Sequence, residues 1–584
     1  MTVFVREKKT VDHKGGWVTI LLALTCFLSP IKIWSQTATA TIPPVKMWVE
    51  SSLQRVFPTS PASDKKDIQL LSARNATLSF QVVVRNEAPK RGLHVKCEVD
   101  GRKDLGIQIR RVGYVPMPHR NTDIDLKVAD GGDHLPGLVP DPLFPESTTT
   151  VGPYENQSFW ITVKVPASIT PGVRVLNILL TAEDGKDKKQ TELGTMSAHV
   201  DVRPFVIKAR HDFPVTHWWS ADGIYDAYKT QPFSETWWKY TERYVADMTA
   251  HGSNVIAVPV FQTRREVVPR PAQLLKVTEI SPGKYSFDFS DVRRFIEMGK
   301  HAGMEYFEFP HMWLYWGVRE PIHVYQREED EYKLLWPTKT DPTTGVYRGF
   351  LEQYLPALRK FLDEEHLDPD HTFFHVSDEP GSGEELANYK RARALLRELA
   401  PWMKTMDALS DVEYGKQHIT DIPVPILQSA QKYIDAGIPH WVYYCTGPRG
   451  DYLNRFYDTP LATIRMSGWL FYHLGAGGFL HWGYNYWYKM DTQQLEDTFM
   501  EGAGGAWPGI AYGDPFVVYP GPDGPIDSIR WEVFAESLQD YAMLQTAGIK
   551  PNSALLADLK SYKDFPREQA WVQQKVQQIL NDSK

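Results

Sequence analysis

Cysteine is scarce in this sequence, with only three among 584 residues. Cys26 lies in an apolar N-terminal run, and Cys97 and Cys445 fall in different predicted domains, so we expect no disulfide framework. The sequence also lacks a C-x-x-C motif, an H-E-x-x-H motif and any tight group of His and Cys, which indicates no metal site. No Gly-rich phosphate loop follows the first strand of the α/β region, so no nucleotide or other cofactor is indicated.

Positive charge is not in excess. The net charge is −8, so we expect neither nucleic acid nor an anionic membrane as a partner. No later segment is apolar enough for a stable membrane span. The N-terminus places basic residues before the apolar run 17–28, and small residues follow up to Ala40. This order is typical of a secretory signal peptide, predicted over 1–40, and predicts export to the periplasm or the extracellular space.

A chain of this length exceeds one hydrophobic core, so two or more domains are expected. From 45 to 204 the pattern is one of short strands separated by Gly, Pro, Asn or Asp. Strands are predicted at 68–71, 78–84, 93–99, 107–114, 158–165, 176–181 and 196–202. About seven such strands predict an antiparallel β-sandwich. The stretch 121–153 is predicted to be a long loop that reaches the neighbouring domain.

After residue 204, strands and helices alternate, as in α/β folds. Strands are predicted at 213–220, 254–259, 304–310, 372–376, 403–409, 426–429, 441–444 and 478–482. Helices are predicted at 236–251, 291–302, 354–363, 384–399, 459–473, 531–547 and 553–581. A strand count close to eight favours a (β/α)8 TIM-like barrel over 205–548, with a C-terminal helical tail at 549–584.

Asp378 and Glu379 come directly after the buried strand 372–376, where a barrel has its active-site face. Because Pro380 disfavours a helical conformation at the preceding residue, we expect an extended chain through the acid pair. Ser382 and Glu385 are predicted to cap the next helix.

Two carboxylates this close do not both ionise readily, so one is expected to keep a proton near neutral pH. A protonated acid beside an ionised one is the combination of groups that glycosidases use to cleave a glycosidic bond. We therefore predict Asp378 and Glu379 as catalytic residues. His375, three residues earlier, is expected to orient a carboxylate.

Other predicted strand ends carry aromatic and polar residues, and the chain has 19 Trp and 28 Tyr. Aromatic rings stack on the apolar faces of sugars, so we expect a lined pocket for a glycan substrate. The predicted substrate-binding residues are His311, Trp313, Trp441, Tyr443, Tyr444, Trp482, Asn485 and Trp487. The sequence does not indicate an oligomeric state.

Three motifs resemble those of glycoside hydrolase family 123, the exo-β-N-acetylgalactosaminidases. They are HVSDEP at 375–380, GFLHWGYNYW at 478–487, and GDPFVVYPG at 513–521 with SIRWE at 528–532 and DY at 540–541. The segment SFQVVV at 79–84 is similar to that family's N-terminal domain. The resemblance covers nearly all of the mature chain.

The resemblance implies a retaining, substrate-assisted mechanism, in which the acetamido oxygen of the sugar attacks its anomeric carbon. Asp378 matches the residue that orients the acetamido nitrogen, and Glu379 matches the general acid/base. A cup for the acetamido methyl group is then expected from Trp441 and Trp482, with a hydroxyl donor from Tyr443 or Tyr444. Asn485 is expected to contact a sugar hydroxyl.

Two alternatives remain open from the residues. The first is a two-carboxylate β-glycosidase in which Glu379 works with Glu308 or Glu532. Glu501, Asp514 and Glu536 are further acids that could serve as a second group. The other alternative is an exported glycan-binding protein without catalysis.

Overall fold

The computed structural model describes residues 44–100, 103–121, 130–183, 190–262, 270–314, 316–328, 331–490, 492–501 and 510–582. The predicted signal peptide at 1–40 lies outside these residues. From residue 42 onward the chain forms one compact unit.

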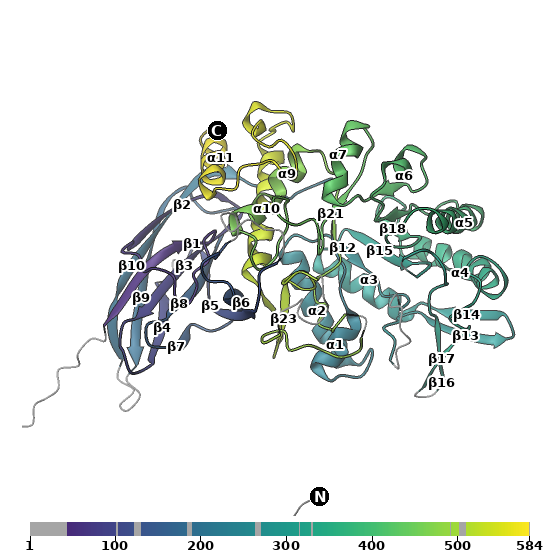
Figure 1. Ribbon diagram of the computed structural model, residues 1–584, viewed down its shortest axis with the longest axis horizontal. Helices are drawn as coiled ribbons and strands as arrows, with labels where there is room; N and C mark the ends of the chain where they lie inside the picture. Colours follow the sequence, from purple (N-terminus) through teal and green to yellow (C-terminus); the bar gives the residue numbers. More distant parts are fainter. Residues whose placement is uncertain are drawn as a thin grey trace, which may run out of the picture. The chain divides into compact units, whose positions relative to one another are not determined.

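Two five-stranded sheets make up the N-terminal part, in the orders β1–β3–β8–β5–β6 and β2–β10–β9–β4–β7 (Figure 1). Neighbouring strands are antiparallel except β2 and β10, which are parallel. The strands are β1 (Val45–Ser51), β2 (Asp67–Arg74), β3 (Ala76–Asn86), β4 (Leu93–Val99), β5 (Gly106–Met117), β6 (Gly137–Phe144), β7 (Thr148–Val151), β8 (Asn156–Val165), β9 (Gly172–Glu183) and β10 (Gln190–Val206).

Alternation of apolar residues explains why these sheets pack face to face. Phe80 and Val82 of β3 lie opposite Ile161 and Phe159 of β8. All four side chains enter one apolar core, which also holds Ile178 of β9 from the other sheet. Since successive side chains of a strand point to opposite faces, each sheet presents one apolar face to the other. The predicted sandwich is confirmed.

Three strands were not predicted, and all of them lie at sheet edges. β1 and β6 end one sheet, and β7 ends the other. The prediction of one long loop over 121–153 is therefore wrong, because β6 and β7 lie within it. Pro140 and Pro142 in β6 hide its strand character, yet proline is tolerated at an edge where a backbone donor can be missing.

A curled parallel sheet follows, with the order β18–β15–β12–β11–β22–β21. β19 and β20 form a separate parallel pair, bridged to β18 at Phe374–Thr405, while Ile426, just after β20, bridges to Tyr443 of β21. The strands are β11 (Val215–His217), β12 (Val255–Ala257), β15 (Tyr306–His311), β18 (Thr372–His375), β19 (Met406–Asp407), β20 (Ile422–Pro423), β21 (Val442–Tyr443) and β22 (Phe479–His481). The predicted order of sandwich and α/β region is correct.

Helices alternate with these strands along the chain (Figure 1). They are α1 (Ala221–Tyr228), α2 (Glu235–Ala250), α3 (Ser290–Ala302), α4 (Gly345–Glu364), α5 (Glu384–Leu399), α6 (Val412–Lys416), α7 (Leu427–Asp435), α8 (Leu461–Arg465), α9 (Ser467–His473), α10 (Ile529–Thr546) and α11 (Gln569–Asp582), with a 3-10 turn η1 (Ala554–Leu556). Three short antiparallel hairpins complete the described fold. They are β13 (Lys276–Ser281) with β14 (Lys284–Asp288), β16 (Tyr325–Glu328) with β17 (Glu331–Leu334), and β23 (Val518–Gly521) with β24 (Gly524–Asp527).

Three predicted elements need correction. The predicted strand 426–429 is wrong, because this segment begins α7 and the strand lies earlier, at β20; short apolar runs do not distinguish the two structures. The predicted helix 459–473 divides at Met466, and there Gly468 approaches α10 so closely that a Cβ would meet the Ser537 carbonyl oxygen at 1.8 Å. The predicted helix 553–581 is replaced by η1 and α11.

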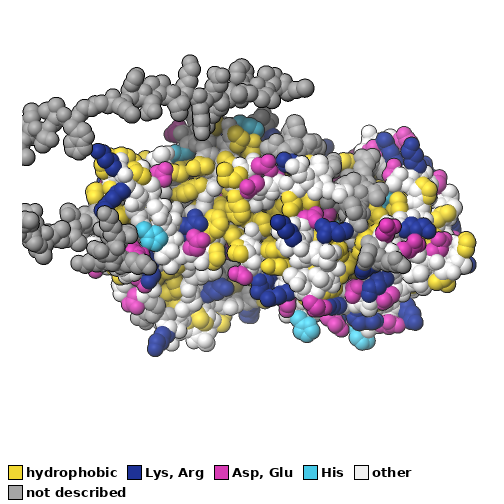
Figure 2. All heavy atoms as spheres, turned by 90° about the horizontal axis from the view of Figure 1, so that it is seen from below, with side chains coloured by type: hydrophobic (Ala, Val, Ile, Leu, Met, Phe, Trp, Pro, Cys, Tyr) yellow, Lys and Arg dark blue, Asp and Glu magenta, His cyan; other side chains and the backbone are white. Residues whose placement is uncertain are grey.

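Cys97 and Cys445 are both free thiols. In the described part of the chain, every helix is too short or too polar to cross a bilayer. Acidic and basic side chains are interspersed with apolar ones over the face drawn in Figure 2.

Candidate active site

The acid pair lies just beyond the carboxyl end of β18. In the neighbouring strand β15, Glu308 lies beside Phe373, and His311 lies beside His375. Because the strands are parallel, the residues that follow them meet at the same edge of the sheet. Asp378 is half-buried and Glu379 is exposed, so Glu379 is the acid more open to a ligand.

The backbone at the acid pair differs from the sequence expectation. Glu379 has φ 40°, so it is left-handed rather than extended. Such a conformation costs about 1–3 kcal/mol and is found mainly at functional sites. The predicted Ser382 cap is also wrong: Gly383 is the N-cap of α5, with φ 68°, and Glu385 instead accepts a hydrogen bond from Gly381 N at 2.8 Å.

Beneath the acid pair, His375 is held between two buried carboxylates. Its Nε2 lies 2.7 Å from Glu308 Oε1, and its Nδ1 lies 3.4 Å from Asp407 Oδ1. Burial by itself would lower the pKa of His375, but hydrogen bonds and charges from Asp407 and Glu308 raise it to about 10. His375 is therefore an imidazolium at neutral pH, which agrees with the expectation that it orients carboxylates.

Both carboxylates are themselves fixed by donors. Thr216 Oγ1 and Trp218 Nε1 each donate to Glu308 at 2.5 Å. Asp407 accepts from Tyr389 Oη at 2.5 Å and from the backbone N–H of Val376 at 3.0 Å. The backbone N–H of Ser377 also donates to Asp407, at 3.2 Å. Asp407 thus holds the segment that leads directly into the acid pair.

Asp378 is the member of the pair whose proton affinity is altered. Burial and the charge of Glu379 raise the pKa of Asp378 well above its ordinary value, the charge of Asp407 acts in the same direction, and the His375 imidazolium opposes them. The surroundings of Asp378 therefore favour its neutral form, which is the direction expected for a buried carboxyl group beside another one.

Tyr443 connects the acid pair to the next part of the site. Its hydroxyl donates to Glu379 Oε1. Burial, together with the charge of Glu379, raises the pKa of Tyr443 well above its ordinary value, so the phenol stays a donor. The structure therefore places one of the predicted hydroxyl donors directly on the acid that is exposed.

Trp482 is half-buried and donates from Nε1 to Asp514 Oδ2 at 2.8 Å. Burial raises the pKa of Asp514 to about 7, although Trp482 and nearby arginines act against it. Burial and then the charges of Asp514 and Glu379 raise the pKa of Cys445 well above its ordinary value. The thiol of Cys445 therefore responds to the charges of both acids.

His311 lies against this network rather than away from it. Its ring is 4.5 Å from that of His375 and 5.3 Å from that of Trp218. Burial and the charge of His375 lower the pKa of His311 well below its ordinary value, so this imidazole is neutral.

Six of the predicted substrate-binding residues are buried: Trp313, Trp441, Tyr443, Tyr444, Asn485 and Trp487. Tyr443 still reaches Glu379 with its hydroxyl, whereas the other five are held by packing contacts or by hydrogen bonds to the backbone. Trp441 packs edge-on against Phe373 at 5.0 Å and lies over Gly478, where a Cβ would come within 2.4 Å of the indole. Tyr444 packs against Phe479 at 5.0 Å. These contacts place both residues in the core of the parallel sheet.

Asn485 and the two remaining tryptophans are held by the backbone. The Asn485 side chain accepts from Ser220 N at 2.6 Å and donates to Ser220 O at 3.1 Å, which fixes the start of α1. Trp313 donates to Pro342 O at 2.6 Å, and Trp487 donates to Val518 O at 3.0 Å. A sugar hydroxyl would have to replace the bonds that Asn485 already makes.

Two residues of the site were not identified from the sequence. Asp407 lies at the end of β19, within a strand that was predicted, so an acid at that position could have indicated a site residue. Trp316 gave none: it lies in a loop, has φ 60°, is 40 % exposed and donates its backbone N–H to Asp378 O at 3.0 Å. An exposed indole beside the acid pair is a candidate surface for a sugar ring.

The sandwich reaches this site through its edge strand β6. Asp141 accepts from Arg530 Nε at 2.8 Å and Nη2 at 3.0 Å. Arg530 also donates to the carbonyl oxygens of Gly513 at 2.7 Å and Phe516 at 3.1 Å, on either side of Asp514. As predicted for the stretch 121–153, part of it contacts the α/β region.

Two groups of side chains bring possible metal-ligating atoms within 4.8 Å of one another, His311 with His375 and Asp407, and Asp247 with His251 and Asp527. In the first group, His375 and Asp407 are engaged with Glu308, Tyr389 and the backbone. In the second, His251 forms ion pairs with both carboxylates. In the first group, His311 Nε2 and His375 Nδ1 are buried and have no hydrogen-bond partner.

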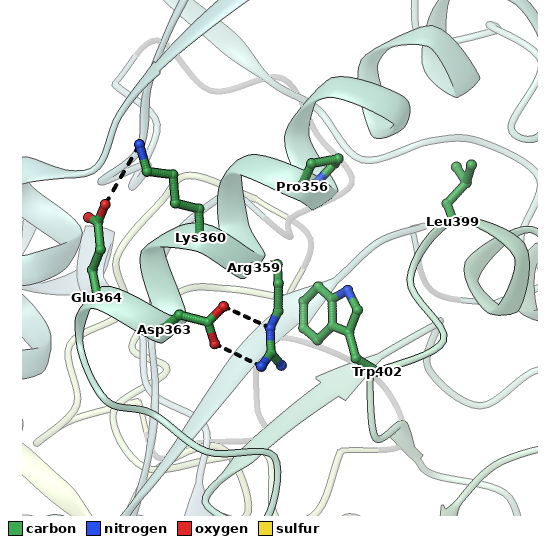
Figure 3. A pocket seen from close by; sticks show the side chains of 7 residues that line it. All are labelled: Pro356, Arg359, Lys360, Asp363, Glu364, Leu399 and Trp402. Carbon is green, nitrogen blue, oxygen red and sulfur yellow. Dashed lines mark hydrogen bonds and ion pairs between the residues drawn. The ribbon is translucent and has the colours of Figure 1, made fainter.

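Two of the hollows in the described part of the chain lie away from the acid pair. One of about 690 Å³ lies between α4 and α5 and is lined by Pro356, Arg359, Lys360, Asp363, Glu364, Leu399 and Trp402 (Figure 3). Its charged groups pair with one another, Arg359 with Asp363 at 2.7 Å and Lys360 with Glu364 at 3.8 Å. The other hollow, of about 340 Å³, is lined by Trp487, Tyr228 and Glu496 among others.

Comparison with known proteins identifies the α/β region. The family model described as glycoside hydrolase 123, catalytic domain, matches residues 218–547. This range includes the acid pair, Tyr443, Trp482 and Asp514. A search of curated proteins found no match.

Among solved structures, the chain is similar to a family 123 glycoside hydrolase from Clostridium perfringens, studied for glycolipid glycan hydrolysis. The TM-score is 0.69 at 15 % identity, covering 92 % of this chain and 98 % of that one, which shows a shared fold. A PapD-like domain of human CEP192 (TM-score 0.15, 10 % identity, 31 % of this chain and 96 % of that one) also matches. The Escherichia coli chaperone DraB gives 0.14 at 9 % identity, over 29 % and 58 %. The last two scores are too low to carry an argument.

Proposed function

The chain belongs to glycoside hydrolase family 123, and from this premise we propose that it removes terminal β-linked N-acetylhexosamine from glycans by retaining, substrate-assisted catalysis. N-acetylgalactosamine is the proposed sugar. The observation that carries the proposal is the acid pair beyond β18, in which Glu379 is exposed and hydrogen-bonded by Tyr443 and Asp378 lies half-buried beside it.

In the proposed first step, the acetamido oxygen forms a bond to the anomeric carbon while the glycosidic bond breaks. Glu379 gives its proton to the leaving oxygen, and Asp378 as a carboxylate accepts a hydrogen bond from the acetamido N–H. In the second step, water attacks the anomeric carbon, the bond to the acetamido oxygen breaks, and Glu379 takes the proton of the water. No second protein carboxylate across the sugar is needed.

The contacts of the other acids favour this mechanism over a two-carboxylate one. Glu308 is almost fully buried and already binds His375, Trp218 and Thr216. Glu532 forms ion pairs with Arg110 of the sandwich at 2.7 Å and with His251 at 3.3 Å. Retention of both Asp378 and Glu379 argues against a purely glycan-binding protein.

Three finer proposals accompany the function. The strand bridges support a closed (β/α)8 barrel, in which the β19–β20 pair joins β18 to β21. The natural substrates are proposed to be glycans of the kind that the Clostridium perfringens relative concerns, those of glycolipids. The N-terminal pattern supports an exported protein.

The test is a panel of aryl β-glycosides of GalNAc, GlcNAc, Gal and Glc. We expect cleavage of the 2-acetamido sugars and loss of at least about 100-fold in kcat/KM without the acetamido group, the usual scale of a missing catalytic group. Equal cleavage of the plain galactoside would contradict substrate assistance.

Two variants test the roles of the acids. Glu379→Gln is expected to lose activity on poor leaving groups and to retain more of it on activated aryl groups, which need little protonation. Asp378→Asn is expected to lose activity on both, because an amide does not stabilise the positive charge that develops on the acetamido group. Glu384→Gln, an exposed acid at the start of α5, is the matched control.

A further inference from the structure

His375 is a buried titratable group that the proposed mechanism does not use. Its side chain is almost completely enclosed, so it does not meet a sugar. It is nevertheless held by Glu308 on one side and Asp407 on the other, at 2.7 and 3.4 Å. An imidazolium fixed in this way is a permanent positive charge directly beneath the acid pair.

The charged and titratable groups that surround His375 come from several strands and from the loop after β18. Glu308 on β15 and Asp407 on β19 are the carboxylates in contact, and Asp378 and Glu379 lie in the loop after β18. The other neighbours are His311, which burial keeps neutral, and the donors Thr216, Trp218 and Tyr389, which bind the two carboxylates. His375 is therefore the cation among several acids.

His375 is the cation that opposes the rise in the pKa of Asp378, although it does not cancel that rise. Burial, Glu379 and Asp407 all favour the neutral acid at Asp378, whereas His375 favours the carboxylate. The proposed mechanism requires a carboxylate there, because a neutral acid would not stabilise the positive charge on the acetamido nitrogen.

We infer that His375 is a positioning residue whose imidazolium, clamped between Glu308 and Asp407, supplies the counter-charge that favours the carboxylate form of Asp378 against the charges of Glu379 and Asp407. The inference rests on the proposed function. The clamp also explains why Asp407 binds the backbone of Val376 and Ser377: the same carboxylate holds the cation and the segment that carries the acids. His375 acts through Asp378 and not on the sugar.

The experiment measures kcat/KM against pH on an aryl 2-acetamido-β-glycoside with an activated leaving group. With such a substrate the acid Glu379 matters little, so the acidic limb reports the ionisation of Asp378. His375→Gln removes the charge and keeps hydrogen-bonding groups. We expect its acidic limb to move to higher pH by about one to two units, the scale on which one nearby charge shifts a pKa.

His375→Lys separates charge from shape. Lysine restores a cation between the two carboxylates but fits the imidazole site less well than glutamine. We expect the acidic limb to return towards the wild-type position. Two results would overturn the inference in favour of a structural role for His375. In one, His375→Gln and His375→Lys have their acidic limbs at the same pH; in the other, both variants have a lower kcat/KM at every pH but keep the wild-type pH profile.

A third variant keeps the test decisive if the first two do not fold. Glu308→Gln removes one anion and leaves His375 between Asp407 and an amide. Because Glu308 helps hold His375 as an imidazolium, we expect the acidic limb to move to higher pH, in the same direction as for His375→Gln, and an unmoved or lowered limb overturns the inference. Thr216→Val, which removes a hydrogen bond from Glu308 without changing charge, is the control and should leave the limb in place.

Failure of the inference is distinguishable from failure of the proposed function. A wild-type enzyme that cleaves galactosides as fast as their 2-acetamido analogues refutes both. Clear dependence on the acetamido group with unshifted limbs in the variants refutes the role of His375 alone.

Discussion

Replacement of Asp141 by asparagine tests whether the sandwich is a working part of the catalytic region. Asp141 and Arg530 form an ion pair in which both side chains are fully buried. Asparagine keeps the size of the side chain, so no cavity forms, but it leaves the charge of Arg530 uncompensated. Removing one partner of a buried pair costs about 3–5 kcal/mol.

The expected loss lies at the low end of that range, about 3 kcal/mol. Arg530 keeps its bonds to Gly513 O and Phe516 O, and Tyr519, which donates to Asp141 at 2.6 Å, can still donate to the amide oxygen. A domain is stable by only about 5–15 kcal/mol, so this change should be large in a denaturant titration. Because Arg530 flanks Asp514, activity should fall at lower denaturant concentration as well.

The assay is a urea titration followed by tryptophan fluorescence, with hydrolysis of the aryl glycoside measured in the same samples. Glu146→Gln is the matched control: Glu146 binds Arg111 in the same sheet at 2.7 Å, but its side chain is 49 % exposed. Exposed pairs contribute about 0–1 kcal/mol, so its midpoint should barely move. If Asp141→Asn shifts the midpoint no more than Glu146→Gln, the reasoning about this junction is refuted.

Two further predictions use the same assays. Trp441→Ala should cost about 3–5 kcal/mol of stability, because it leaves a cavity in a packed core. Trp482→Ala should chiefly raise KM. The reverse pattern would indicate that Trp441, and not Trp482, contacts the sugar. Burial would raise the pKa of Glu532, but Arg110 and His251 lower it to about 2. The ionised Glu532 therefore stabilises the folded state above the unfolded pKa of about 4.5, and this stabilisation is lost as the pH falls towards 2. Glu532→Gln should flatten the fall of the urea midpoint between pH 5 and 2; an unchanged fall would contradict this assignment.

Elements with strong periodic patterns were predictable. α5 was placed within its observed bounds, and all seven predicted sandwich strands are present, because their apolar residues repeat with the period of the structure they form. Edge strands such as β6 were not predicted, because proline and polar residues interrupt the alternation of apolar and polar residues there. The strand at 426–429 was misplaced because a short apolar run fits a helix start equally well.

The same division holds for the site. Adjacent acids after an apolar strand were enough to indicate Asp378 and Glu379, since that position depends on local sequence alone. The partners of the acids were harder to predict. Trp441, Tyr444 and Asn485 also lie at or near strand ends, but their side chains make contacts inside the protein. The position of a residue in a strand does not reveal which residues its side chain contacts.

The sequence by itself determined the order of the sandwich and the α/β region and the family, because these depend on local pattern and on motif residues. It also predicted the acid pair as the catalytic site. Only the tertiary structure decided that Glu379 is left-handed and bound by Tyr443, and that Asp141 of the sandwich supports the loop of Asp514. It also brought Glu308, His375 and Asp407 together from three strands. Contacts between residues far apart in the chain depend on how the strands assemble, which no local pattern encodes.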